Sequence, residues 1–182
     1  MEIPLEGARI RSWKRGDQSS LVRYADNRRI WINLRDRFPH PYRPADAREW
    51  LAHVTAQSPE TNFAIEVGGE AVGGIGFHTQ EDVHRGSAEI GYWLGEPFWG
   101  RGIATQAVRA ITDHALRVHG LNRLYAYVFE WNPASARVLL KAGFTQEGRL
   151  RRSVTKDGHT IDQFLYAIVA EPADDPRGGN PR

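Results

Sequence analysis

The stretch FWGRGIATQAV, residues 98–108, places two glycines directly before a helical pattern. Glycine costs stability beside a helix start because its backbone is the most flexible. Two explanations fit: the chain turns tightly there, or a ligand approaches the backbone closely. The first turn of the expected helix carries free N–H groups and the positive end of the dipole, which together suit a phosphate. From these residues alone, a phosphate site and a plain turn are equally supported.

Two common phosphate motifs do not fit this stretch. The Walker pattern GxxxxGK followed by Ser or Thr almost matches residues 95–102. However, Arg101 stands where lysine is needed, and Gly102 where a hydroxyl would hold magnesium. The dinucleotide pattern GxGxxG fails at Thr105. The residues therefore give little support for a nucleoside triphosphate or NAD site.

Composition excludes several classes of function. The chain has 182 residues, enough for one domain, and 25% of them are charged with a net formal charge of only +2. The arginines are scattered rather than clustered, so we expect no direct nucleic-acid partner. No apolar run approaches the roughly 20 residues that span a bilayer, so we expect no membrane partner.

Cysteine and histidine usage narrows the chemistry further. The chain has no cysteine, which excludes disulfides, thiolate zinc sites and a cysteine nucleophile. Its seven histidines show no tight ligand spacing, so we expect no metal. The first 15 residues lack a secretory apolar core. We therefore expect a cytoplasmic protein.

Hydrophobic periodicity predicts one α/β (α+β) domain with a mixed, mostly antiparallel sheet of about seven strands and about four helices. The expected strands are 8–13, 62–67, 71–78, 87–94, 123–129, 144–154 and 159–169. The expected helices are 17–27, 45–57, 103–119 and 132–143, with room for a further helix up to Leu34. Asp157 and Gly158 suit a type I′ hairpin turn. The domain covers residues 1–170, and the Pro- and Gly-rich tail 171–182 is expected to be disordered.

Several motifs together resemble the GNAT (N-acetyltransferase) superfamily. Trp99–Ala104 resembles its acyl-CoA pyrophosphate loop, Arg or Gln followed by Gly-x-Gly-x and Gly or Ala, except for tryptophan at the first position. AEIGYWL at 88–94, NPAS at 132–135 and KAGF at 141–144 resemble the RimJ/RimL-like, ribosomal-protein-alanine N-acetyltransferase branch. FPHPY at 38–42 is also similar to that branch. The resemblance covers roughly residues 5–170.

The resemblance implies a sheet that splays between strands 87–94 and 123–129, with acetyl-CoA as cosubstrate and no metal. The pantetheine amides would bond to one strand edge, and the diphosphate would reach the helix N-terminus past the two glycines. The implied cofactor-binding residues are Trp93, Leu94, Gly100, Arg101, Gly102, Ile103, Ala104, Thr105 and Asn132.

Acetyl transfer to an amine needs a neutral amine, and the leaving thiolate benefits from a proton. Glu89 is the first candidate base, because the resemblance places carboxylates of this strand in that role in some members. A glutamate that orders a neighbouring loop or the acceptor is equally supported. Some relatives carry a proposed acid residue after the Gly-Phe element, but here no carboxylate lies between Glu147 and Asp157. Asp162 is therefore the second candidate base.

Ser135 is the candidate acid, because the matching serine of relatives is proposed to donate to the CoA sulfur. A serine in the first turn of a helix is equally well explained by local structure. Asn132 is expected to cap the same helix and could also bond the pantetheine. Tyr92 is a second candidate proton donor. The expected acceptor-binding residues are Trp31, Phe38, Tyr42 and Tyr92, for which core packing is the alternative.

These residues predict an acetyl-CoA-dependent N-acetyltransferase that works by direct attack of the amine. A thiol ping-pong route is closed because there is no cysteine. A protein N-terminal amine is the first acceptor hypothesis. The alternatives are a small-molecule amine (antibiotic, polyamine or amino acid) and a non-catalytic acyl-CoA-binding sensor. The expected partners are acetyl-CoA and the acceptor, with the chain a monomer or homodimer.

Overall fold

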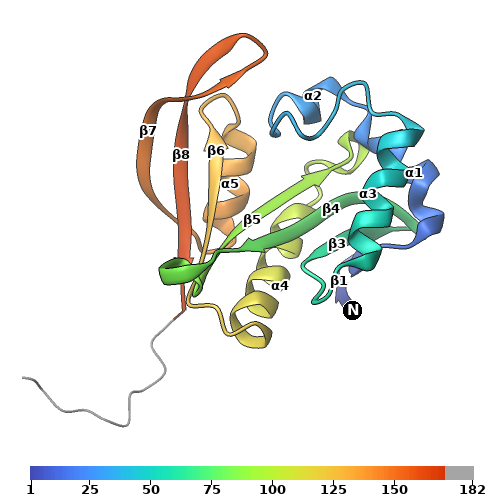
Figure 1. The fold of residues 1–182 in the computed structure, drawn as a ribbon, viewed down its shortest axis with the longest axis horizontal. Coiled ribbons are helices and arrows are strands. Elements are labelled where there is room, and N and C mark those ends of the chain that lie inside the picture. Colours follow the sequence, from blue (N-terminus) through green and yellow to red (C-terminus); the bar gives the residue numbers. More distant parts are fainter. Residues whose placement is uncertain (171–182) are drawn as a thin grey trace, which may run out of the picture.

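The computed structural model describes residues 1–170, so the tail predicted from Glu171 lies outside the described residues. One sheet contains eight strands in the order β1-β2-β3-β4-β5-β6-β8-β7 (Figure 1). The strands are β1 (Glu2–Leu5), β2 (Ala8–Ser12), β3 (Asn62–Val67), β4 (Glu70–Thr79), β5 (Ser87–Leu94), β6 (Arg123–Phe129), β7 (Thr145–Lys156) and β8 (His159–Val169). The helices are α1 (Gln18–Ala25), α2 (Arg28–Trp31), α3 (Pro44–Ala56), α4 (Ile103–Val118) and α5 (Pro133–Lys141).

The predicted fold class is confirmed, with two additions. β1 is an eighth strand, which its pattern does not reveal because it is four residues long and contains Pro4. It pairs with β2 at the sheet edge, where proline is tolerated. The single turn α2 makes a fifth helix, in the segment up to Leu34 where the sequence left room for one. The hairpin turn was predicted correctly, because Asp157 (φ 49°) and Gly158 (φ 78°) both adopt the positive φ of a type I′ turn.

Within residues 1–170, only β5 and β6 pair in parallel, and they do so over three residue pairs, from Ser87↔Arg123 to Glu89↔Tyr125. β5 continues to Leu94 against β4, and β6 continues to Phe129 against β8. Helix α4 connects the two strands, as a parallel crossover requires. The predicted splay is therefore present, and it divides the sheet into a β1–β5 half and a β6–β8 half.

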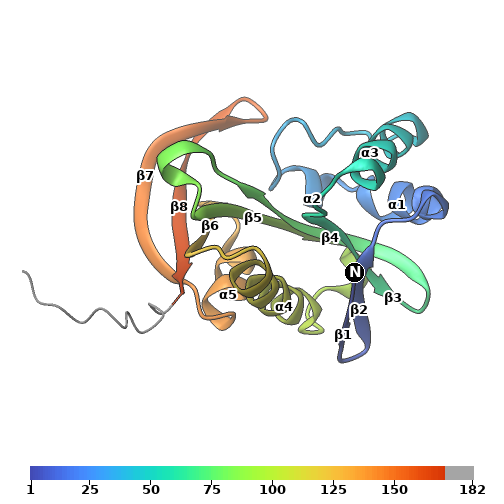
Figure 2. The same cartoon turned by 60° about the horizontal axis from the view of Figure 1, so that its bottom comes forward.

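Helices cover both faces of the sheet. Figures 1 and 2 show α4 and α5 on one face and α1 to α3 on the other. The larger core lies under α4, where Ile103, Val108 and Ile111 pack against strand residues. The smaller core joins Leu21 of α1 to Leu51 of α3. Within residues 1–170, none of the helices combines the length and apolar character that crossing a membrane requires.

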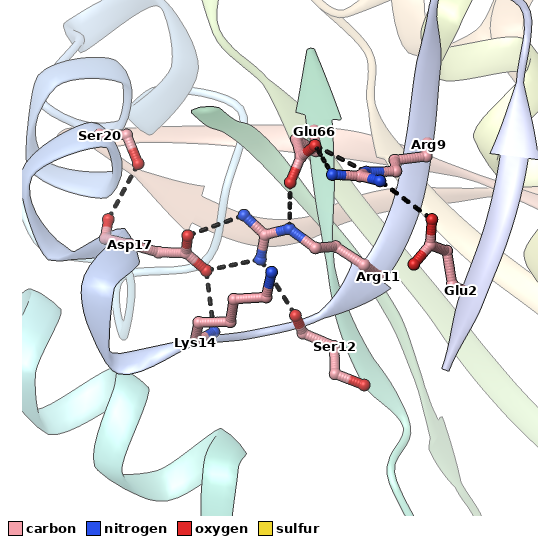
Figure 3. Close-up of polar contacts among 8 residues, drawn as sticks. All are labelled: Glu2, Arg9, Arg11, Ser12, Lys14, Asp17, Ser20 and Glu66. Atoms are coloured by element: carbon pink, nitrogen blue, oxygen red, sulfur yellow. Dashed lines mark hydrogen bonds and ion pairs between the residues drawn. The ribbon is translucent and has the colours of Figure 1, made fainter. Parts of the chain in front are cut away.

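A buried charge network ties the start of α1 to the sheet (Figure 3). Arg11 of β2 donates from Nη1 and Nη2 to both carboxylate oxygens of Asp17, each at 2.7 Å, and from Nε to Glu66 of β3. Arg9 also donates from Nε to Glu66, at 2.6 Å. The backbone N–H of Lys14 donates to Asp17 at 2.8 Å. These bonds compensate for removing the charges from water and fix where α1 begins.

The pH dependence of this network follows from Glu66. Burial alone would raise the pKa of Glu66, but hydrogen bonds from Arg11 and Arg9 outweigh it and hold this pKa below its ordinary value. A lower pKa in the folded state means that the network contributes fully above the ordinary glutamate value of about 4.3. Its contribution is lost as the pH falls through the lower value of the folded state.

We expect Glu66→Gln to lower the free energy of unfolding by about 1.5–3 kcal/mol near neutral pH, because a charged hydrogen-bond acceptor is lost. The difference from wild type should shrink on acidification below about pH 4. Urea unfolding at both pH values measures this. Glu70→Gln is the control, because its 3.0 Å pair with Arg23 is exposed and should contribute little. A difference that grows on acidification would contradict the stated role of Glu66.

Candidate functional site

A cleft of about 1110 Å³ opens where β5 and β6 diverge, and residues from both halves of the sheet line it. All but three of the predicted site residues are in its lining. They are Phe38, Tyr42, Glu89, Tyr92, Trp93, Leu94, Gly100, Gly102, Ile103, Ala104, Thr105, Asn132 and Ser135. The three predicted residues outside the lining are Arg101, Trp31 and Asp162. The splay therefore gathers residues from four separate parts of the chain into one space.

The N-terminus of α4 forms one end of this cleft. Gly100 (φ 75°) and Gly102 (φ 77°) are both in the left-handed region, which favours glycine. The first intrahelical bond runs from the N–H of Gln106 to the carbonyl of Gly102, so the N–H groups of residues 103–105 precede it. A Cβ at Gly100 would meet no atom within 4 Å, and one at Gly102 would meet only the end of Gln106. The glycines therefore satisfy both explanations: they permit the turn and leave the N–H groups accessible.

Arg101 has a different environment from the glycines beside it. Its guanidinium carbon lies 5.6 Å from the ring centroid of Phe98, and its side chain is outside the cleft lining.

The register of β5 decides which backbone groups face the gap. The N–H of Gly95 donates to the carbonyl of Val72 at 2.7 Å, so residues 95, 93 and 91 turn toward β4. The backbone groups of Tyr92 and Leu94 therefore face the gap. The carbonyl of Leu94 already accepts a bond of 2.6 Å from the indole of Trp99.

Trp93 differs from the expectation that its backbone offers hydrogen bonds to a ligand. Its backbone is turned toward β4, and its ring lies 5.8 Å from that of Phe38 on the α1–α3 face. The register therefore favours Tyr92 over Trp93 as the ligand-facing backbone position. The alternation of residues along the strand could not decide between Tyr92 and Trp93. That decision requires the pairing partner of Gly95, which only the structure gives.

Ser135 and Tyr92 form a hydroxyl pair on the α5 side of β5. The Oγ of Ser135 lies 2.8 Å from the Tyr92 hydroxyl. Burial raises the pKa of Tyr92 far above its ordinary value, so the phenol stays protonated. Since residues 92 and 89 lie on opposite faces of the strand, Tyr92 belongs with Ser135 rather than with the expected acceptor wall.

Asn132 has the predicted capping role. Its side-chain oxygen accepts a bond of 3.2 Å from the N–H of Ser135, and Pro133 follows at the first helical position. This cap fixes the first turn of α5, and with it the place of Ser135 in the cleft.

Glu89 faces the opposite side of the strand and is held by an arginine. Its side chain is 20% exposed and forms an ion pair with Arg35. His78 lies opposite it on β4 and accepts at Nε2 from Arg37, at 3.1 Å. Burial, then the charge of Arg37, lowers the pKa of His78, so its imidazole is neutral near pH 7. No sequence pattern points to Arg35, Arg37 or His78, and the first two lie in a loop without periodicity.

Asp162, the second candidate base, has a structural role. It does not line the cleft. Its two oxygens accept from the N–H of Arg152 at 2.7 Å and from Nε of Arg149 at 2.5 Å. These hydrogen bonds lower the pKa of Asp162, and the bond from Arg152 has the largest effect. They hold the irregular stretch of β7 between Leu150 and Val154, so Glu89 remains as the carboxylate candidate.

The loop after α2 supplies the wall beside Glu89. Phe38 packs on Tyr42 with ring centroids 5.1 Å apart, and burial raises the pKa of Tyr42. Trp31 lies elsewhere: its ring centroid is 3.8 Å from the ammonium nitrogen of Lys156 on β7. Phe38 and Tyr42 thus line the cleft and also belong to the smaller core, so their expected part in acceptor binding stays a prediction, whereas Trp31 lies outside the lining. Among residues 1–170, no group of three or more His, Asp or Glu side chains is arranged to hold a metal ion.

Comparisons with known proteins agree with this geometry. The model of the acetyltransferase (GNAT) domain family matches residues 8–145. The ribosomal-protein-serine acetyltransferase of Escherichia coli K12 is 35% identical over 109 residues, 60% of each chain. The spermidine N(1)-acetyltransferase of the same strain is 33% identical over 116 residues, 64% of this chain and 59% of the relative.

A solved structure supports the same assignment over more of the chain. Mycobacterium smegmatis RimJ, in complex with CoA-disulfide, is 29% identical with a TM-score of 0.77, covering 90% of this chain and 82% of RimJ. The first curated relatives are matched over only 46% to 65% of their own length. The family model nevertheless covers most of the described residues, from β2 to the start of β7, and the chain belongs to the GNAT acetyltransferase family.

Proposed function

We propose that this protein is an acetyl-CoA-dependent N-acetyltransferase in which a primary amine attacks the thioester directly. The observation that carries the proposal is the single cleft that joins the α4 N-terminus to both Glu89 and Ser135. A non-catalytic acyl-CoA sensor would need the α4 N-terminus but neither Glu89 nor Ser135. The presence of a carboxylate and a hydroxyl pair on opposite faces of β5 favours an enzyme.

The residues of the cleft suit acetyl-CoA in two places. The N–H groups of residues 103–105, at the positive end of α4, would hold the diphosphate. The gap-facing backbone of Tyr92 and the N–H of Leu94 would bond the pantetheine amides as a neighbouring strand would. No side chain is needed for either contact. The acetyl thioester supplies the group that is transferred.

Two residues would move protons in the proposed reaction. Both an N-terminal ammonium, with a pKa of about 8, and an alkylammonium, with a pKa of about 10, are mostly protonated near pH 7, so Glu89 would accept a proton from the acceptor, directly or through water. The amine nitrogen then forms the amide bond as the carbon–sulfur bond breaks. Ser135 would donate a proton to the leaving thiolate and recover one from Tyr92, whose hydroxyl is 2.8 Å away. The second proton of the amine, released as the amide forms, would pass through water to Tyr92 and restore its phenol.

We further propose a protein N-terminal amine as the acceptor. The name of one relative, the ribosomal-protein-serine acetyltransferase, supports a protein acceptor, whereas the name of the spermidine relative supports a polyamine. Thiol release from acetyl-CoA with a panel of peptides and small amines decides between them. Mass spectrometry of the products identifies the acetylated atom. Thiol release with none of the acceptors would favour the sensor.

We expect Gly102→Ala to weaken acetyl-CoA binding at least tenfold, because a methyl group would stand beside the N–H groups of the α4 N-terminus. The variant should also lose roughly 1–2 kcal/mol of stability, since φ is 77° there. Gly120→Ala is a matched control: φ is 63° and the surrounding space is open, but Gly120 does not line the cleft. Calorimetric titration and urea unfolding measure both effects. Equal loss of affinity in the two variants would argue against the diphosphate site.

We expect Ser135→Ala to reduce turnover by about 100-fold or more while acetyl-CoA affinity stays within twofold, because general acid help has that size. Tyr92→Phe should reduce turnover as well, and the double variant should be little worse than Ser135→Ala, since the two hydroxyls act in one relay. Steady-state kinetics with one saturating acceptor measures this. A loss below about threefold for Ser135→Ala would leave the serine with a structural role only.

We expect Glu89→Gln to lower the rate near neutral pH and to recover part of it at high pH, where more of the amine is neutral without help. Glutamine can still accept the bond from Arg35, so the loop should keep its position. Turnover against pH for both forms measures this. A constant ratio of the two rates across the pH range would show that Glu89 orders the site and is not the base.

A further inference from the structure

Three consecutive residues after α2 reach three different strands. Arg35 pairs with Glu89 of β5, Asp36 accepts from Lys156 of β7 at 2.7 Å, and Arg37 donates to His78 of β4 at 3.1 Å. β4 and β5 belong to one half of the splayed sheet, whereas β7 belongs to the other. This segment, which we call the 35–37 bridge, therefore spans the opening between the two halves.

Lys156 is the buried anchor of the bridge. Its side chain is only 2% exposed, although it is the last residue of β7 and its partner Asp36 is 75% exposed. Its ammonium nitrogen lies 3.8 Å from the ring centroid of Trp31. A lysine is rarely buried unless its charge is compensated, and here a carboxylate and an aromatic face share that task. Figure 1 shows the β7–β8 turn reaching toward α2.

A second cavity of about 310 Å³ lies against the bridge, lined by Arg35, Asp36 and Lys156 among others. It shares with the main cleft the residues Leu34, Arg35, Tyr127, Phe129 and Gln163. The space beside Glu89 therefore continues along the bridge toward the β7–β8 hairpin. Its width depends on where residues 35–37 lie.

From this arrangement we propose that Lys156 is a positioning residue for the amine acceptor, an inference that rests on the function proposed above. Lys156 acts through Asp36: it holds the 35–37 bridge so that Arg35 stays on Glu89 and the acceptor passage keeps its width. Loss of the lysine charge should free the bridge and misplace Glu89 and the acceptor. Among residues 1–170, no hydrogen bond or ion pair joins residues 35–37 to the α4 N-terminus, so acetyl-CoA binding should be unaffected.

The test compares Lys156→Met, which keeps an unbranched side chain only one atom shorter and removes the charge, with Lys156→Arg and Arg28→Gln. Lys156→Met should lower kcat/KM for the acceptor at least tenfold and leave the acetyl-CoA Kd within twofold. Lys156→Arg should restore kcat/KM to within about threefold of wild type, because it keeps a cation over Trp31. Arg28→Gln removes the 2.5 Å pair with Asp157 between the same two segments, and should change little because that pair is exposed.

Limited trypsin digestion gives a readout that does not depend on activity. Cleavage after Arg35 and Arg37, located by mass spectrometry, should be at least tenfold faster in Lys156→Met than in wild type. Should that variant fail to fold, Asp36→Asn changes an exposed side chain and breaks the same ion pair, with the same expected results.

Two results would overturn the positioning role. One is unchanged acceptor kinetics together with unchanged trypsin protection in the folded variant. The other is an acetyl-CoA affinity that falls as much as kcat/KM, which indicates general loss of structure. If wild type acetylates no acceptor, the proposed function fails, while the trypsin comparison still decides whether Lys156 holds the bridge.

Discussion

The separation of β5 from β6 after three residue pairs is the constraint on which the site depends. Each strand keeps a partner on its outer side, β4 for one and β8 for the other, so the sheet stays intact while its centre opens. The inner edges are left with backbone groups that need partners. The indole of Trp99 donates to the carbonyl of Leu94, and a ligand with amide groups could pair with the other backbone groups of these edges. Because α4 begins beside the same edge, strand-like and phosphate-like contacts both come from the backbone.

Strand alternation separates the chemistry of the site into two groups. Tyr92 points to the α4–α5 face and meets Ser135, whereas Glu89 points to the α1–α3 face and meets Arg35. In the proposed reaction the leaving thiolate and the attacking amine would therefore be served from opposite faces of one strand. The Arg11 network contributes from a distance, because it fixes the start of α1 against the sheet. α1 in turn packs on α3, whose residues line the far wall of the cleft.

Local features of this fold could be predicted from the sequence, and contacts between distant segments could not. Three local features depend only on a few neighbouring residues and could be predicted from sequence patterns. They are the turn at Gly100 and Gly102, the Asn132 cap and the Asp157–Gly158 turn. Trp31 carries no such signal, because its contact with Lys156 joins residues 125 positions apart along a chain whose register is not known beforehand. The sequence could not exclude Asp162 as a base, because its hydrogen bonds with Arg149 and Arg152 depend on an irregularity in β7 that has no sequence signal.

Arg35 both restrains Glu89 and leaves it free to act in the proposed reaction. A carboxylate offers about four lone-pair positions on two oxygens, and Arg35 donates to Oε1. Among residues 1–170, Oε2 has no hydrogen-bond donor within bonding distance. Glu89 can thus be oriented by one oxygen while the other accepts the proton of an incoming amine. The 35–37 bridge ties Arg35 to both halves of the sheet. The orientation of the Glu89 side chain is therefore linked to the width of the opening through which that amine must come.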